Sequence, residues 1–224
     1  MQALRLVLPL RSYARRCAGT AAVYLALIIE PLGAAPLVEI DYVTVGDPGN
    51  PNDSTGYGQV DYVYQIGKYE VTCAQYAAFL NARAKRDTNG LYNPGMASSS
   101  RGGIVRAGTE GSYTHTVKAG FANVPVCFVN FYDALRFCNW LHNGAMEFSD
   151  TETGAYALSG SNVPGIERTN KALVFLPSDN EWYKAAYYHA TSSGGPANGY
   201  WLYPTKSNVA PVGEPPSGGV NSAN

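Results

Sequence analysis

Residues 176–188 read L-P-S-D-N-E-W-Y-K-A-A-Y-Y, and the fold is organised around this stretch. It follows the short apolar run 172–176, which is typical of a buried strand. Ser178 and Glu181 have the S-x-x-E spacing of a capping box, which predicts that a helix begins here. Four residues then share one helical face: Trp182, Ala185, Ala186 and His189. We therefore expect Trp182 to be the buried anchor that packs this helix on the core.

The composition indicates one domain that is rich in loops. The chain has 224 residues, which leaves no need for a second domain. It contains 24 Gly and 14 Pro but only 15% charged residues, a balance that disfavours a helical bundle. The formal net charge of −1 gives no electrostatic footprint for nucleic acid or for an acidic membrane. These two classes of partner are therefore excluded.

The first 35 residues have the pattern of a secretory signal peptide. A basic beginning that contains Arg5 and Arg11 is followed by the uncharged, mostly apolar run 18–29, which is too short to span a bilayer comfortably. Small residues at 33–35 offer a cleavage site after Ala35. The alternatives are a retained membrane stem and an organelle transit peptide. The prediction is a mature domain of residues 36–224, secreted or periplasmic, with no membrane span after cleavage.

The cysteines and histidines do not form a recognisable metal or catalytic motif. Cys17 leaves with the signal peptide, so Cys73, Cys127 and Cys138 remain. An odd number of cysteines in an exported protein leaves at least one free thiol or a bond to another chain. No C-x-x-C occurs, and no two of the three histidines are spaced as a metal-binding pair on one helix. His115 alternates with apolar residues in an expected strand, so we expect its imidazole to be solvated.

Several further elements are expected along the chain. Thr72 with Gln75, and Asn130 with Asp133, have the spacing of helix N-terminal caps. The remaining patterns are two strands, a glycine-linked hairpin and a terminal loop, at residues 38–45, 60–66, 104–117 and 205–224. Because the chain closes on a loop with no final strand or helix, we expect the domain to be incomplete at its C-terminal end.

Four stretches, in the same order, resemble the formylglycine-generating enzyme or sulfatase-modifying factor family. They are Y-Q-I-G-K-Y-E-V-T-C-A-Q-Y at 64–76, V-P-V-C-F-V-N-F-Y-D-A at 124–134 with F-C-N-W-L at 137–141, L-P-S-D-N-E-W-Y-K-A-A at 176–186, and Y-P with Asn208 at 203–208. In the last stretch Thr205 stands where the family has Trp. The resemblance covers roughly residues 38–224, and any one stretch alone would be a weak pattern.

The resemblance implies a compact, irregular α+β domain of C-type-lectin-like topology with little regular secondary structure. It also implies an oxidase that converts Cys to formylglycine in an exported sulfatase, using copper and oxygen. The family's two redox cysteines follow N-V-W-E-W and R-G-G-S-W motifs, and neither motif occurs here. By resemblance, residues 222–224 begin a calcium-binding segment with Asn224 as one ligand. Calcium is thus implied by resemblance, and copper only if the C-terminal redox part is present.

Three functions follow as hypotheses. The first is an exported protein of the sulfatase-modifying-factor type that lacks the redox cysteine pair in this chain and is inactive as given. The second is a non-catalytic, lectin-like module that binds a peptide or a glycan on the aromatic residues Tyr200, Trp201 and Tyr203, for which core packing is the competing interpretation. The third, an iron-dependent sulfoxide synthase, requires a His-rich helical pattern that is absent.

Overall fold

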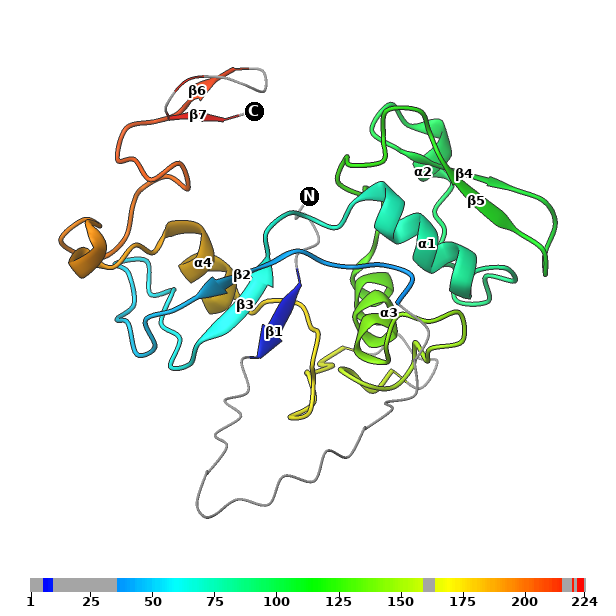
Figure 1. Ribbon diagram of the computed structural model, residues 1–224, viewed down its shortest axis with the longest axis horizontal. Coiled ribbons are helices and arrows are strands. Elements are labelled where there is room, and N and C mark those ends of the chain that lie inside the picture. The colour runs from blue at the N-terminus through cyan, green and yellow to red at the C-terminus, as the bar shows by residue number, and fades with distance from the viewer. Residues whose placement is uncertain (1–5, 10–35, 159–163, 215–218, 220, 224) are drawn as a thin grey trace, which may run out of the picture.

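The computed structural model describes residues 6–9, 36–158, 164–214, 219 and 221–223. They form an α+β domain of short elements joined by long loops (Figure 1). The strands are β1 (Val7–Pro9), β2 (Tyr42–Val45), β3 (Tyr64–Gly67), β4 (Ile104–Ala107), β5 (Thr114–Val117), β6 (Val212–Gly213) and β7 (Ser222–Ala223). The helices are α1 (Cys73–Arg83), α2 (Gly95–Ser98), α3 (Phe131–His142), α4 (Asp179–Tyr187) and the short 3-10 turn η1 (Thr191–Ser193).

A three-stranded antiparallel sheet of order β1-β3-β2 lies between α4 and the α1–α3 pair (Figure 1). Ile66 at its centre faces Val7 of β1 on one side and Val43 of β2 on the other. Strands were expected at 38–45 and 60–66, and the structure has shorter ones at 42–45 and 64–67. β1 was not expected, because it lies in the segment that resembles a signal peptide.

The core lies mainly between α1 and α3. Tyr76 and Phe79 of α1 meet Phe137 and Trp140 of α3, with ring centroids 5.3 to 5.8 Å apart. All four side chains are 0% exposed, so the two helices share one aromatic cluster that favours close edge and tilted packing. The Trp140 indole N–H donates to the carbonyl of Met146 at 2.7 Å, so its polar atom is satisfied.

The three expected helix starts are confirmed. Thr72, Asn130 and Ser178 are N-caps, and each accepts a hydrogen bond from a backbone N–H three residues ahead. In each case the side chain three residues further on accepts a hydrogen bond from the backbone N–H of the N-cap residue, which completes a capping box. These starts are predictable because the bonding groups lie within one turn of each other.

The expected hairpin is also confirmed, but His115 within it was placed wrongly. β4 and β5 pair in the register Arg106 to His115, and Gly108 and Gly111 turn the chain at φ +88° and +90°. His115 is only 4% exposed, because its ring packs on Tyr92 with centroids 5.3 Å apart. Neither of its ring nitrogens has a hydrogen-bond partner. Burial, together with the nearby Arg106, lowers the pKa of this imidazole to about 4.

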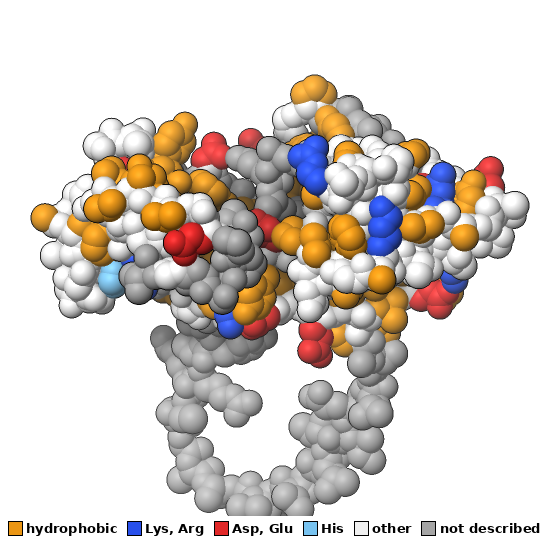
Figure 2. Space-filling model, turned by 90° about the horizontal axis from the view of Figure 1, so that it is seen from above, with side chains coloured by type: hydrophobic (Ala, Val, Ile, Leu, Met, Phe, Trp, Pro, Cys, Tyr) orange, Lys and Arg blue, Asp and Glu red, His pale blue; other side chains and the backbone are white. Residues whose placement is uncertain are grey.

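Helix α4 also differs from the expectation. Trp182 is 40% exposed, whereas Glu181 and Lys184 are buried, so the prediction that Trp182 anchors the helix in the core is wrong. The helix is rotated so that one acidic and one basic residue face inward, which apolar periodicity cannot anticipate. Figure 2 shows hydrophobic side chains on the surface of the lobe at left, which carries α4 in Figure 1.

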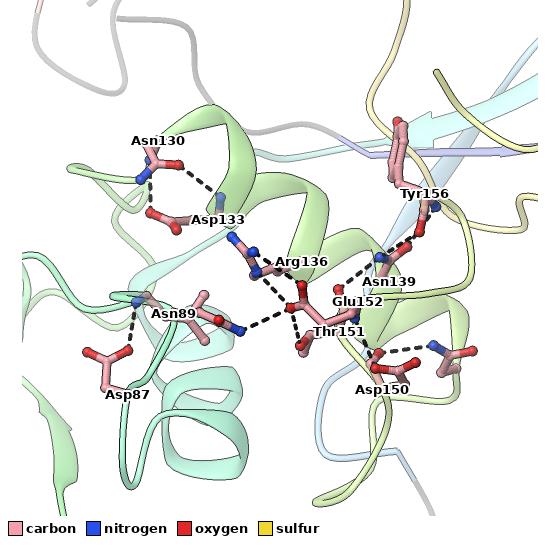
Figure 3. A network of polar contacts seen from close by, with 12 residues as sticks. Asp87, Asn89, Asn130, Asp133, Arg136, Asn139, Asp150, Thr151, Glu152 and Tyr156 are labelled. Atoms are coloured by element: carbon pink, nitrogen blue, oxygen red, sulfur yellow. Dashed lines mark hydrogen bonds and ion pairs between the residues drawn. The ribbon is translucent and has the colours of Figure 1, made fainter. Parts of the chain in front are cut away.

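A polar network on α3 holds the loop that follows this helix (Figure 3). Arg136, only 2% exposed, forms two bonds to the carboxylate of Glu152 at 2.8 and 3.2 Å. Asn139 donates to the carbonyls of Thr151 and Tyr156 and accepts from the Tyr156 N–H. The loop therefore has a defined course although it contains no helix or strand.

None of the helices in the described part of the chain combines the length and apolar character needed to cross a bilayer.

Two tryptophan substitutions test the placement of α4. Trp140→Ala should lower the free energy of unfolding by about 3–5 kcal/mol, because it empties a fully buried ring site. Trp182→Ala should cost less than about 1 kcal/mol, because much of its indole is already in water. Urea melts of the two variants measure the difference. Equal losses would contradict the observed orientation of α4.

The buried imidazole of His115 should make stability depend on pH. Its pKa is about 4 in the folded state and about 6.5 unfolded, so the unfolded state alone takes up the proton between these values. This contribution is complete above pH 6.5 and is lost as the pH falls toward 4. At pH 4.5 the wild type should lose about 2 kcal/mol more than His115→Leu does, relative to pH 7. A parallel loss in both proteins would refute this.

The comparison with the variant is necessary because Asp133 acts in the opposite direction. Burial raises its pKa to about 6, so its contribution to stability is lost as the pH rises from 4 to 6. Asp133 is present in both proteins, and the difference between them therefore isolates His115.

Candidate functional site

The inner face of α4 carries an ion pair that fixes the helix, in which the Glu181 side chain is buried and the Arg168 side chain is partly exposed. The Glu181 carboxylate, on a side chain that is 0% exposed, accepts two hydrogen bonds from Nη1 of Arg168 at 2.8 and 3.0 Å. The hydroxyl of Tyr62 donates to the same carboxylate at 2.5 Å, and the hydroxyl of Tyr64 donates to the Glu181 backbone carbonyl. Glu181 also accepts the Ser178 N–H within the capping box. One residue thus joins the helix start, β3 and the loop before α4.

The second buried charge on α4 is Lys184, which is 1% exposed. Its ammonium donates to the carbonyl of Asp47 at 2.7 Å and lies 5.6 Å from the centre of the Tyr188 ring. Burial lowers the pKa of Lys184, while the nearby Asp47 and Asp61 act in the opposite direction. Lys184 therefore ties α4 to the loop of residues 47–61.

This loop is also fastened to the chain beyond α4. Asn50 donates to the carbonyl of Gly58 and to the hydroxyl of Tyr200, each at 2.7 Å. The hydroxyl of Tyr200 in turn donates a hydrogen bond to the carbonyl of Pro51. A Cβ at Gly58 would lie 2.4 Å from the Tyr200 hydroxyl oxygen and 2.8 Å from its ring, and the φ of Gly58 is +104°, so glycine is required at this position.

The outer face of α4 presents an aromatic row, which we define as Tyr57, Tyr183, Tyr187 and Trp182. Successive ring centroids lie 6.0, 4.7 and 6.0 Å apart. Tyr57 and Trp182, at its two ends, are 48% and 40% exposed. Such a row is large, rigid and partly exposed to solvent, as aromatic side chains at binding surfaces are.

A carboxylate borders the aromatic row. The hydroxyl of Tyr183 donates to Oδ2 of Asp53 at 2.7 Å. This bond is the main cause that lowers the pKa of Asp53, so its carboxylate stays ionised and has lone pairs left to accept hydroxyl groups. Tyr188 donates in the same way to Asp47. The row therefore combines ring faces with acceptors for polar groups.

Of the three aromatic residues expected to bind ligand, Tyr200 and Trp201 contact this row, and Trp201 does so by donating its backbone N–H to the carbonyl of Tyr187. Tyr200 is 3% exposed and supports Tyr183 and Tyr188 from beneath, with ring centroids 5.8 and 5.0 Å away. Trp201 is half-buried and donates its indole N–H to His189. Tyr203 is half-buried as well. The most exposed rings of the row, those of Trp182 and Tyr57, lie on α4 and in the loop between β2 and β3.

The sequence pattern predicted neither the aromatic row nor the ion pair beneath it. Tyr183 and Tyr187 stand four apart on a helix, which is a usable signal once the helix is known to turn that face outward. The pairing of Arg168 with Glu181 carries no such signal, because Arg168 lies in a loop outside the helix.

The three cysteines within the described ranges lie away from the aromatic row. Cys73 and Cys138 are buried and Cys127 is half-buried, and all three thiols are free. Burial raises the pKa of the Cys73 and Cys138 thiols. The sulfurs of Cys73 and Cys127 each lie 3.9 Å from the carbonyl oxygen of Pro125, a proximity that spacing along the sequence did not indicate.

The described residues offer no cation site of the usual kind. Among them, no three His, Cys, Asp or Glu side chains gather closely enough to hold a metal ion. Asn224, the calcium ligand implied by resemblance, lies outside the described residues.

Comparison with known proteins agrees with this architecture. The family model for the sulfatase-modifying factor enzyme 1-like domain matches residues 58–219. The chain therefore belongs to the sulfatase-modifying factor family, and its fold is the α+β domain of that family. No match was found among curated proteins or among solved structures.

Loss of this ion pair should destabilise the domain. Arg168→Ala leaves the buried Glu181 carboxylate without its cation and should cost about 2 kcal/mol or more. Lys68→Ala is the matched control, because Lys68 pairs with Asp41 at 3.8 Å on the exposed surface and should cost less than about 1 kcal/mol. Denaturant melts measure both, and a small loss in Arg168→Ala would show that Glu181 is satisfied without the pair.

Proposed function

We propose that this chain is an exported, non-catalytic member of the sulfatase-modifying factor family that binds a carbohydrate on the aromatic row of α4. The observation that carries the proposal is the row itself: four rings at spacings of 4.7 to 6.0 Å, exposed at both ends and bordered by the ionised Asp53. Sugar rings offer apolar C–H faces that stack on aromatic rings, and their hydroxyls donate to carboxylates. Export is inferred from the basic residues and the apolar run at the beginning of the sequence.

The second candidate is the oxidation of cysteine to formylglycine, which family membership and the closeness of Cys73 and Cys127 favour. Copper in such a reaction requires thiolates, since soft sulfur ligands select Cu(I). Cys73 is 0% exposed and burial raises its thiol pKa, so it is a protonated and inaccessible ligand. The cysteines of the described residues therefore do not fit a copper pair, and we favour binding over oxidation.

Titration with oligosaccharides tests the binding proposal. Intrinsic fluorescence should change on binding, because Trp182 lies in the row and is 40% exposed. Trp182→Ala and Tyr57→Ala should each raise the Kd by about fivefold or more, as expected for exposed aromatic residues that contact a ligand. Phe131→Ala is the matched control: Phe131 is 55% exposed at the start of α3, outside the row, and its loss should leave the Kd unchanged.

The same purified proteins distinguish carbohydrate binding from peptide binding and from cysteine oxidation. If a library of short peptides binds through Trp182 and oligosaccharides do not, the ligand class is wrong. If Phe131→Ala weakens binding as much as Trp182→Ala, the row is not the site. Conversion of Cys to an aldehyde in a C-x-P-x-R peptide, followed by mass spectrometry with copper and oxygen supplied, would establish the oxidase instead.

A further inference from the structure

Strand β1 lies between two segments that are distant in sequence. On one side it pairs antiparallel with β3, where Val7 faces Ile66 and Gly67 donates its N–H to the carbonyl of Leu6 at 2.8 Å. On the other side Val7 exchanges two backbone bonds with Phe175, at 2.8 and 3.1 Å. Figure 1 shows β1, in dark blue, beside β3 in the middle of the molecule. We call the space between β3 and Phe175 the strand slot.

The side chains of β1 belong to the core. Leu6 is 1% exposed and Val7 is 0% exposed, and both lie in the main cluster of buried hydrophobic residues. An empty slot would leave a cavity where these two side chains pack. It would also leave the backbone groups of Gly67 and Phe175 without partners, and unpaired backbone groups are costly away from water.

The occupant of the slot comes from an unusual part of the sequence. Leu6 and Val7 precede the apolar run 18–29 and the expected cleavage site after Ala35. A cut at that site separates β1 covalently from residues 36–224. Because β1 is bonded along both of its edges, a cut in the chain does not by itself remove it from the slot.

We propose that the strand slot is a strand-acceptor site whose occupant is Leu6–Pro9 of the protein's own leader, and that the folded protein keeps this strand after the chain is cut behind it. The site recognises an extended backbone through bonds to Gly67 and Phe175, and it recognises sequence through the two adjacent apolar side chains. A cut made after folding then yields two pieces held together without a covalent bond.

Cleavage after folding tests the proposal on the full chain. A protease recognition sequence is inserted between Gly19 and Thr20, and the folded protein is cut and passed through a sizing column. Denaturing mass spectrometry should find the N-terminal fragment in the protein peak. Val7→Asp should release the fragment, because it places a charge at a fully buried position. Leu37→Asp is the matched control, since Leu37 is 52% exposed, and it should retain the fragment.

If Val7→Asp fails to fold, the proposal can still be tested by exchanging the bound N-terminal fragment for an added peptide. A fluorescent peptide of residues 1–12 should replace the fragment in the cut wild-type protein, whereas the same peptide with Val7→Asp should not. Dilution of the cut protein until the fragment leaves should lower Tm by roughly 10 °C or more. Loss of the fragment with an unchanged Tm and no uptake of peptide would overturn the proposal, because another segment would then fill the slot.

Discussion

The hydrogen bonds and the ion pair of the buried Glu181 carboxylate are the interactions on which the α4 side of the molecule depends. This carboxylate closes the capping box that starts α4, accepts both short bonds from Arg168, and takes the hydroxyl of Tyr62. A carboxylate in the interior is stable only when its lone pairs are satisfied and a cation is present, so all of these groups are held in place together. The direction in which α4 turns its outer face, and with it the aromatic row, follows from this constraint.

Local signals in the sequence were sufficient for the beginnings of the helices and for the hairpin. Thr72, Asn130 and Ser178 bond to groups three residues away, and Gly108 and Gly111 permit the backbone angles that the turn requires. Family membership followed from short stretches in order and is shown by the family model over residues 58–219. These features are predictable because each depends on a few neighbouring residues.

The failures have a common physical origin, which is burial determined by contacts with residues outside the local sequence pattern. Trp182 was expected in the core because it is the largest apolar residue of α4. The inner face instead carries Glu181 and Lys184. Their charges are compensated by the Arg168 guanidinium and by the carbonyl of Asp47. His115 was expected in water, yet its ring packs on Tyr92. No spacing rule reports partners such as these.

The polar contacts of α3 and those that dock α4 join residues at very different separations along the sequence. On α3, Asn139 bonds to groups 12 and 17 residues away. The contacts that dock α4 and the chain beyond it span 119 residues from Tyr62 to Glu181 and 150 from Asn50 to Tyr200. Because the entropy lost on closing a loop grows with its length, the α3 framework is favoured to form early and the α4 docking late. The outer face of α4 is then the part of the molecule that acquires its final geometry last during folding.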